Sequence, residues 1–185
     1  MLPPLTFRPP TGARLADPSR MMTNVRIAFC LFLVGCTSWH LERPEKTLVH
    51  TQTAVPPNYA KVCVVRTSLL ASAVTFPTHD NGVLVGATRG PTHFCYLAEP
   101  GRHEIAIEAD ETERARLDAE AGRTYYLKQN VDNVFGWVHC RAGWINEAEA
   151  REAFESSSYE VLTGVPGEER LPPDPPVAPA KRDRP

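Results

Sequence analysis

Cysteine and histidine have the widest chemistry of the side chains in this sequence, and two pairs of them lie in predicted strands. His93 and Cys95 are two residues apart, a spacing that places both side chains on one face of a strand. His139 and Cys140 are adjacent and so point to opposite faces. Zinc sites usually contain closer pairs such as CxxC or HxxxH, which this sequence lacks. We therefore expect no metal at these four residues and no cofactor elsewhere.

The sequence contains none of the common hydrolase motifs. It has no Gly-x-Ser-x-Gly, no His-Glu-x-x-His and no glycine-rich phosphate loop. An acidic cluster of Glu108, Asp110, Glu111 and Glu113 has the residue types of paired carboxylates or a calcium site. Calcium loops also carry a glycine at their sharp turn, and this cluster has none. We expect it to be a solvated loop, and we do not expect an enzyme.

A cysteine near the N-terminus lies in a different context. Residues 27–35 form an apolar run of nine, whereas a membrane-spanning helix needs about 20 residues. Arg26 precedes this run, and its end, Leu33-Val34-Gly35-Cys36, resembles the lipobox of bacterial lipoprotein signal peptides. In such signals the thiol receives a diacylglycerol and a peptidase cuts between Gly35 and Cys36. We expect Cys36 to carry the lipid, palmitate included.

The alternative is a short buried helix with an incidental cysteine, which does not explain the order of charge, apolar run, small residue and cysteine. Residues 1–20 are an unusually long, proline-rich leader. We therefore expect translation to begin at Met21 or Met22, so that 1–20 is a mis-assigned extension and 21–35 is the signal peptide. By analogy, the Thr-Ser pair at 37–38, in place of an aspartate, favours the periplasmic leaflet of the outer membrane.

Three cysteines remain for the exported domain, because Cys30 lies in the signal peptide. Cys63, Cys95 and Cys140 all lie in predicted strands, and in an oxidising compartment they allow at most one internal disulfide. Cys63 with Cys95 is the first choice for such a pair. Three buried free thiols that pack as small apolar side chains are the state we favour.

Charge and proline content bound the remainder of the chain. Removing the four arginines and one aspartate that precede Cys36 from totals of 20 basic and 22 acidic residues leaves 16 and 21, a net charge of -5. Such a domain is a poor candidate for binding nucleic acid or anionic lipid. Residues 36–58 are expected to be the lipidated cysteine and a flexible tether, which could reach roughly 70 Å when extended. Residues 156–185 are expected to be a linker and a disordered, proline-rich tail.

Residues 59–155 have the pattern of a domain of short strands. Turn signals recur about every ten residues, at Asp80-Asn81-Gly82, Arg89-Gly90-Pro91, Glu99-Pro100-Gly101 and Glu120-Ala121-Gly122. The intervening runs are rich in β-branched and aromatic residues, and they predict strands at 60–67, 72–77, 83–87, 92–97, 103–109, 124–131 and 134–140. Within 103–109, Ile105 and Ile107 share one face and Glu104 and Glu108 the other. Asn81-Gly82 is typical of a two-residue type I′ hairpin.

A short helix is expected to close the domain. Asn146 is a good N-cap, and Glu149, three residues later, completes a capping box. Residues 148–154 are strong helix formers. We expect Ile145, Ala148 and Phe154 to pack the helix on an edge of the sheet.

Five aromatic residues lie close together in the sequence, at Tyr125, Tyr126, Phe135, Trp137 and Trp144. Exposed aromatic rings on a sandwich face could bind a glycan or a peptide. Phe135 and Trp137 share a strand face, and core packing is the interpretation we favour for the group.

The stretch 60–154 resembles an uncharacterised bacterial domain that occurs in many lipoproteins, the domain of unknown function number 2846. The matching segments are AKVCVVRTS, ASAVTF, DNGVLVG, THFCYLAEPGRHEIAIE, AGRTYYLKQ and INEAEAREAF. The most specific parts are Pro100-Gly101-x-His103 and Ala121-Gly122-x-Thr124-Tyr125-Tyr126. The resemblance implies a prealbumin-like or carboxypeptidase-regulatory-like β-sandwich on a lipid anchor, and no catalytic residue comes with it. The cysteines at 63, 95 and 140 depart from the family pattern.

These features together predict an all-β sandwich of about seven strands with one short C-terminal α-helix. We expect a non-enzymatic, lipid-anchored module of the cell envelope that contacts an envelope protein or glycan through a sheet edge or face. A periplasmic carrier of a small ligand or metal is the first alternative, and a hydrolase is the second. The expected partners are the membrane, through diacylglycerol on Cys36, and that envelope component, with nucleic acid excluded.

Overall fold

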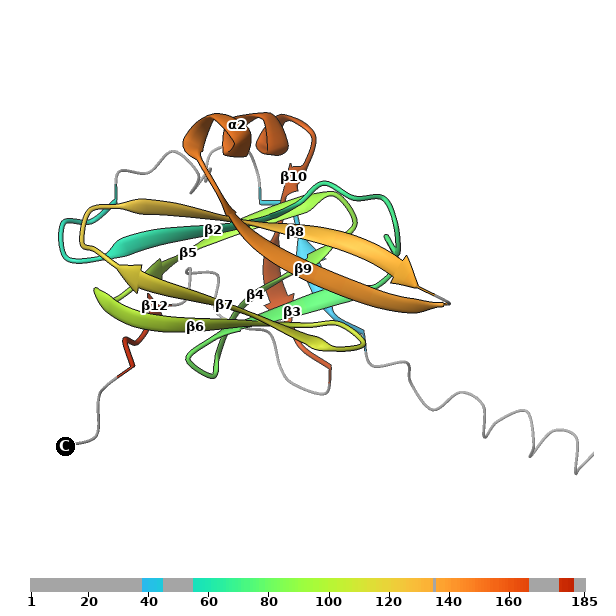
Figure 1. Cartoon of the computed structure of the whole chain (residues 1–185), viewed down its shortest axis with the longest axis horizontal. Helices are drawn as coiled ribbons and strands as arrows, with labels where there is room; N and C mark the ends of the chain where they lie inside the picture. The colour runs from blue at the N-terminus through green and yellow to red at the C-terminus, as the bar shows by residue number, and fades with distance from the viewer. Residues whose placement is uncertain (1–37, 45–54, 135, 167–176, 182–185) are drawn as a thin grey trace, which may run out of the picture. The chain divides into compact units, whose positions relative to one another are not determined.

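The computed structural model of the chain describes residues 38–44, 55–134, 136–166 and 177–181 (Figure 1). The expected extension, start codon, signal peptide and lipobox, with Gly35 and Cys36, lie outside these residues, as does Phe135. Within the described ranges, no helix has both the length and the apolar character needed to cross a membrane.

Strands dominate the described residues. Their bounds are β1 (His40–Glu42), β2 (Ala60–Arg66), β3 (Thr75–Asp80), β4 (Val83–Arg89), β5 (Thr92–Ala98), β6 (Gly101–Glu108), β7 (Thr112–Ala119), β8 (Thr124–Val134), β9 (Trp137–Ile145), β10 (Ser158–Tyr159), β11 (Val161–Gly164) and β12 (Val177–Ala178). One main sheet has the order β10-β5-β2-β8-β9, with β12 as a second partner of β5. The other has the order β4-β3-β6-β7, and β1 pairs with β11. The architecture is therefore mostly β and sandwich-like, as the sequence predicts.

The core lies between the two main sheets. Val62 and Val64 of β2, Ile105 and Ile107 of β6, and Leu127 of β8 are all fully buried in it. Glu104 and Glu108 lie on the opposite face of β6, where Glu108 is exposed. The predicted alternation of β6 is thus confirmed, because one face of this strand meets the other sheet and one meets water.

The β3–β4 hairpin forms as its sequence predicts. Asn81 has a φ of 48° and Gly82 a φ of 84°, so both central residues have the positive φ that a type I′ turn requires. The Asn81 side chain also bonds to β6, because its Oδ1 accepts a hydrogen bond from Glu104 N at 3.0 Å. The hairpin is therefore fixed to β6 as well as to itself.

The single described helix, α2 (Glu147–Glu155), begins where predicted but packs differently. Asn146 and Glu149 form the complete capping box. The helix lies over the outer face of the larger sheet, against β2, β8 and β10, rather than on a sheet edge (Figure 1). Ala150 and Ala153 are its buried residues, whereas Ala148 is exposed. The expectation for Ala148 is wrong because residues three apart share a helix face and residues two apart do not.

The number of strands exceeds the predicted seven, since the described residues form twelve. The longest omission is β7, whose sequence TERARLDA was not among the predicted strands. Its outward positions carry Arg114, Arg116 and Asp118, and its inward positions carry small or aliphatic residues such as Ala115 and Leu117. β7 contains too few β-branched residues to be predicted as a strand from its sequence. It is a strand because it pairs with β6 over its whole length.

Two segments that were expected to be unstructured are paired. Within the predicted tether, β1 is hydrogen-bonded to β11. Within the predicted disordered tail, β12 is paired in parallel with β5, and Ala178 is fully buried. β10 and β11 also follow residue 155, so the expected end of the domain at that residue is wrong. Amino-acid composition did not predict these segments as strands. Backbone hydrogen bonds and the small buried side chain of Ala178 hold them, rather than a large apolar side chain.

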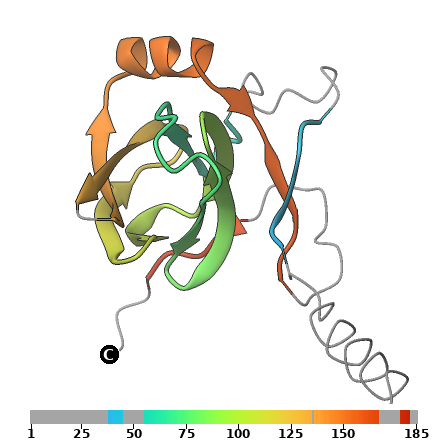
Figure 2. The same cartoon turned by 90° about the vertical axis from the view of Figure 1, so that its right-hand side faces the viewer.

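The register of the strands defines two ends of the sandwich. Arg66, the last residue of β2, lies opposite Thr92 of β5 and Gln129 of β8. Loop 67–74, the β4–β5 turn, the β6–β7 turn and the β8–β9 hairpin therefore gather at one end, which we call the loop end. The β3–β4 hairpin, the β5–β6 turn and β12 lie at the other, which we call the tail end. Figure 2 views the protein from the side on which the β8–β9 hairpin lies in Figure 1.

Candidate functional site

The strands β7 and β9 are the facing edges of the two main sheets, and side chains join them along a seam. Asp110 Oδ2 accepts a hydrogen bond from Val138 N at 2.6 Å, and Glu113 Oε1 accepts one from Ala142 N at 3.3 Å. The backbone N–H of Asp110 also donates to Val138 O at 3.3 Å. Two carboxylates thus bond to the edge of β9 in place of a neighbouring strand.

The expectation of a solvated loop for the acidic cluster is confirmed only in part, because the cluster is exposed but also bonds to β9. Glu108 belongs to β6 and Glu113 to β7, so that only Asp110 and Glu111 lie in the turn between these strands. Glu111 lies 3.7 Å from His139 Nδ1, and Glu108 lies 3.4 Å from His79 Nδ1. The cluster therefore connects strands, although Glu108, Asp110 and Glu111 remain exposed to solvent.

Toward α2 the seam opens into a cleft of about 690 Å³, which we call the seam cleft. Its lining comes from β7, β8, β9 and the start of α2, and comprises Arg116, Leu117, Asp118, Thr124, Tyr125, Tyr126, Trp144, Ile145, Asn146 and Glu147. Tyr125 and Trp144 meet edge to face, with ring centroids 6.3 Å apart. Trp144 is 39% exposed, so part of its ring remains available to a ligand.

Backbone groups fix both rings of the cleft. Trp144 Nε1 donates to Arg116 O at 3.0 Å. The Tyr125 hydroxyl accepts from Glu120 N at 3.0 Å and donates to Asp118 O at 3.4 Å. With their polar atoms already bonded, the rings offer a ligand mainly their apolar surfaces. Hydrogen bonds and charge must come from the polar side chains of the lining.

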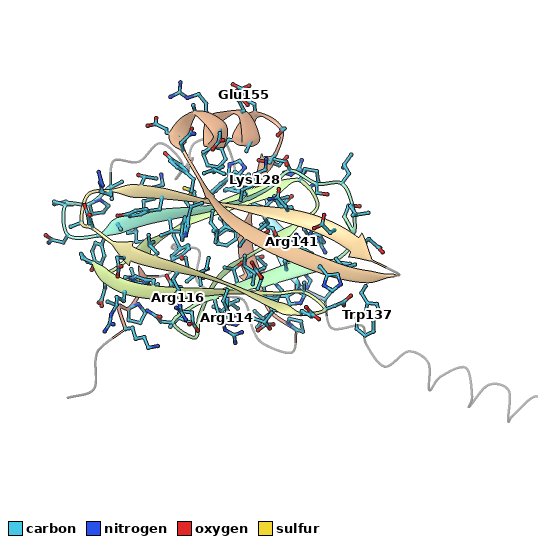
Figure 3. All side chains as sticks on the ribbon, in the orientation of Figure 1. Arg114, Arg116, Lys128, Trp137, Arg141 and Glu155 are labelled. Atoms are coloured by element: carbon cyan, nitrogen blue, oxygen red, sulfur yellow. A yellow bond between two sulfur atoms is a disulfide. The ribbon has the colours of Figure 1, made fainter. Side chains whose placement is uncertain are left out.

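A second hollow of about 520 Å³ lies beside the same part of β7, where this strand pairs with β6. The two share Arg116, Leu117 and Asp118, and Lys181 of the tail contributes to the second. Figure 3 labels Arg114 and Arg116 beside β6 and β7, at the smaller of the two main sheets. A groove of this form suits an extended ligand better than a compact one.

A second group of polar residues, at the tail end, is sealed inside the core. His103 Nδ1 lies 2.9 Å from both carboxylate oxygens of Asp80, and its Nε2 donates to Glu99 O at 2.7 Å. Tyr96 donates to Asp80 Oδ2 at 2.9 Å. Burial alone lowers the pKa of His103, but the hydrogen bonds to Asp80 and Glu99 and the Asp80 charge outweigh it and raise this pKa. Both side chains of the pair are 0% exposed, so no solute reaches them.

A third group surrounds Arg66 at the loop end. Its side chain is fully buried, with the guanidinium 4.3 Å from the centre of the Phe76 ring. Nearby, Thr88 donates to Gln129 Oε1 at 2.6 Å. Among the described residues, Arg66 Nε, Gln129 Nε2 and Thr78 Oγ1 are buried without a hydrogen-bond partner. This part of the core is therefore polar but incompletely bonded.

The structure joins two of the three exported-domain cysteines. Cys63 and Cys95 lie directly opposite each other on β2 and β5, with their Cα atoms 4.1 Å apart, and form a disulfide. Of the two alternatives, three free thiols is therefore wrong, because the strand register brings this pair together. Cys140 is free and buried, and burial raises its pKa to about 12, so its thiol is unreactive.

The candidate metal ligands do not gather into a site. Cys95 is in the disulfide, and the His93 ring packs against Phe154 and Tyr159, with centroids 4.5 and 5.5 Å away. Burial lowers the pKa of His93 to about 4, and its Nδ1 lies 2.8 Å from Ser157 Oγ. In the part of the chain that the structure describes, no group of three or more His, Cys, Asp or Glu side chains could hold a metal ion.

The aromatic residues divide between surface and interior. Trp137 is 62% exposed at the loop end, so the expectation that it packs in the core is wrong. Tyr126 packs edge to face against Phe154 of α2, with centroids 5.9 Å apart. Tyr125 and Trp144 form the seam cleft. Sequence reasoning missed Arg116 and Asp118, because they lie on the strand that it did not predict.

Comparison with known proteins adds no relative. No protein-family model matches the chain, and neither a curated protein nor a solved structure is similar to it. The resemblance to the domain of unknown function number 2846 stays a prediction. The function must be inferred from the residues and geometry of this chain alone.

Proposed function

We propose that this protein is a lipid-anchored, non-enzymatic module of the bacterial cell envelope that binds an extended segment of an envelope protein in its seam cleft. The observation that carries this proposal is the cleft itself, with fixed rings and a polar lining. In this proposal Cys36 holds the lipid in the outer membrane, and the fold is the prealbumin-like or carboxypeptidase-regulatory-like sandwich that the resemblance implies.

Charges of both signs line the cleft and favour a protein segment over a neutral glycan. Arg116 can pair with a carboxylate of the ligand, and Asp118 and Glu147 can pair with a cation. The Tyr125 and Trp144 rings supply the apolar contact that usually dominates binding energy in protein interfaces. Two carbonyls of β7 already accept bonds from these aromatic side chains, so side-chain contacts rather than strand addition would hold the segment.

The sealed polar group supports a non-catalytic assignment. Asp80, His103 and Tyr96 are residue types that acid–base catalysis uses. Their side chains lie inside the core, however, where a substrate would have to displace packed residues to reach them. A structural role for these three residues accounts for their position.

Photo-crosslinking in living cells tests the binding proposal. A photoreactive aromatic residue at position 144 should capture one reproducible protein species, and the Arg116→Glu change should reduce that capture. The matched control places the same group at Val83, which is 37% exposed on β4, the edge of its sheet opposite β7. Equal capture from both positions, or none from position 144, would overturn the proposal.

The anchor has its own test. Labelled palmitate should appear on the wild-type protein, and the Cys36→Ser variant should lose both the label and its partition into detergent. If the variant still partitions with membranes and the wild type takes up no label, the anchor assignment is wrong.

A further inference from the structure

We propose that the loop end lies against a bilayer of zwitterionic lipid, with Leu69, Leu70, Val74 and Trp137 in its head-group region. This inference rests on the proposed lipid at Cys36, and it adds an orientation and a second membrane contact to the anchor. It concerns a different surface from the seam cleft.

Exposed apolar side chains concentrate at this end of the protein. Seven large apolar side chains are exposed among the described residues, and four of them are at the loop end. Leu69 is 75% exposed, Trp137 62%, Leu70 44% and Val74 40%. Single exposed apolar residues are ordinary, but several on neighbouring loops mark a contact surface. Leucine and tryptophan are also residues that enter the membrane interface readily.

The loop that carries three of these residues is fixed rather than free. Arg66 donates to the carbonyls of Leu70, Ala71 and Val74, at distances of 2.6, 2.8 and 3.0 Å. Ala71 has a φ of 52°, a value that non-glycine residues rarely adopt. The Arg66 guanidinium and the backbone conformation of Ala71 thus fix this loop, although its leucine side chains are exposed to water. A fixed apolar loop loses less entropy on entering a lipid surface than a flexible one does.

The position of β1 connects the anchor to this end. β1 begins at His40, four residues after Cys36, a distance of at most about 14 Å. Its partner β11 follows β10, and β10 pairs with Thr92–His93 at the start of β5, which lies at the loop end. Glu42 lies opposite Val161 at the start of β11, and His40 lies opposite Gly164 at its end. Figure 1 shows β1, in blue, toward the side of the view on which β8 ends. A lipid on so short a connection keeps this part of the domain close to the bilayer.

Charges around Trp137 select the kind of lipid surface. Asp110 Oδ2 is bonded to Val138 N, and Glu111 lies beside His139 on the same strand as Trp137. Asp132 of β8 lies opposite His139 in the strand register and pairs with Arg141 at 3.2 Å, so the carboxylates of this group outnumber its arginine. Anionic head groups would be repelled by these carboxylates, whereas zwitterionic head groups would not.

Two tryptophans on β9 allow the depth of the two ends of this strand in the bilayer to be compared. Trp137 and Trp144 are seven residues apart on one strand, or about 23 Å. The full-length lipidated protein is placed in phosphatidylcholine vesicles whose acyl chains carry bromine, which quenches nearby tryptophan. One variant, W39F/W144F, keeps only Trp137, and the other, W39F/W137F, keeps only Trp144. We expect bromine to remove about half of the Trp137 emission and little of the Trp144 emission, since interfacial side chains sit about 5–10 Å into the bilayer.

Introducing negative charges into the apolar loop completes the design. In the Trp137-only protein, L69D/L70D should lower the quenching about twofold, and V177D, a matched change at the exposed tail-end residue Val177, should leave it unchanged. Adding phosphatidylglycerol should weaken the quenching. Equal quenching of Trp137 and Trp144 in labelled, vesicle-bound protein would overturn this inference and leave the anchor intact. Absence of the palmitate label would overturn the anchor, and this inference with it.

Discussion

The two ends of the sandwich each contain a buried cationic side chain, but they accommodate it in different ways. At the tail end, His103 lies against the carboxylate of Asp80, and the Glu99 carbonyl accepts its other N–H. At the loop end, Arg66 lies on the Phe76 ring and donates to three backbone carbonyls, and no carboxylate takes part in these hydrogen bonds. The His103 side chain is paired with an anionic carboxylate, whereas the Arg66 side chain is stabilised by the dipoles of backbone carbonyls.

The difference corresponds to what each end holds. The His103 group lies beneath the tail, where Asn81 Nδ2 donates to Pro179 O at 2.9 Å and Glu99 N donates to Ala178 O at 2.9 Å. Arg66 holds its own loop, and arginine stays protonated at any physiological pH. The tail end therefore contains a side chain that can titrate, His103, whereas the loop end has the permanent charge of Arg66 at its centre.

The largest effect is expected from Arg66→Ala, which removes the donor shared by three loop carbonyls. Leaving these groups without partners should lower the free energy of unfolding by about 4 kcal/mol. Urea denaturation measures the change. Arg43→Ala is the control, because the Arg43 side chain is 69% exposed in its pair with Glu160 and should contribute less than about 0.5 kcal/mol. Equal urea midpoints for the two variants would show that the stability of the protein does not depend on the Arg66 side chain.

A smaller loss is expected from Asp80→Asn, which keeps the shape of the side chain but removes its charge. His103 then has no anionic partner in the core, and at pH 6 the free energy of unfolding should fall by about 3 kcal/mol. Asp132→Asn is the matched control, since the pair of Asp132 with Arg141 is exposed and should be worth less than about 0.5 kcal/mol. A loss no greater than the control's would remove the distinction between the two ends.

The raised pKa of His103 predicts a pH dependence that belongs to the tail end alone. His103 titrates near 6.5 in the unfolded chain and at higher pH in the folded one, because of its bonds to Asp80 and Glu99. The folded state therefore binds more protons between these two values. The stabilisation is complete below pH 6.5 and is lost as the pH rises through the folded pKa. Unfolding at several pH values should show this decline in the wild type and in Arg66→Ala, and not in Asp80→Asn.

The smallest effect concerns the attachment of the tail. Ala178→Asp places a charge at a fully buried position and should release β12, with a global loss of about 1 kcal/mol. Hydrogen exchange should accelerate at the N–H groups of Glu99 and Lys181, which bond to Ala178 O and Arg102 O. Val177→Asp is the neighbouring control, because Val177 is 43% exposed. Unchanged exchange in Ala178→Asp would mean that the tail is held by contacts other than this strand.

Features that depend on neighbouring residues could be predicted from the sequence. The Asn81-Gly82 hairpin, the Asn146–Glu149 capping box and the alternation of β6 all follow from local backbone preference or from a period of two. Five aromatic residues were also singled out, and three of them line the seam cleft. These predictions needed no knowledge of which strands are neighbours.

Features that depend on the register between distant segments could be seen only in the folded protein. The Cys63–Cys95 disulfide joins residues 32 apart, and nothing in the spacing distinguishes this pair from free thiols. β7 contains few β-branched residues and β12 is only two residues long, and both form because β6 and β5 offer them an unpaired edge. Trp137 was expected inside and lies outside, because the β8–β9 hairpin carries it beyond the facing sheet. Period and propensity indicate which residues can form a strand, but pairing partners decide which strands form and which faces they bury.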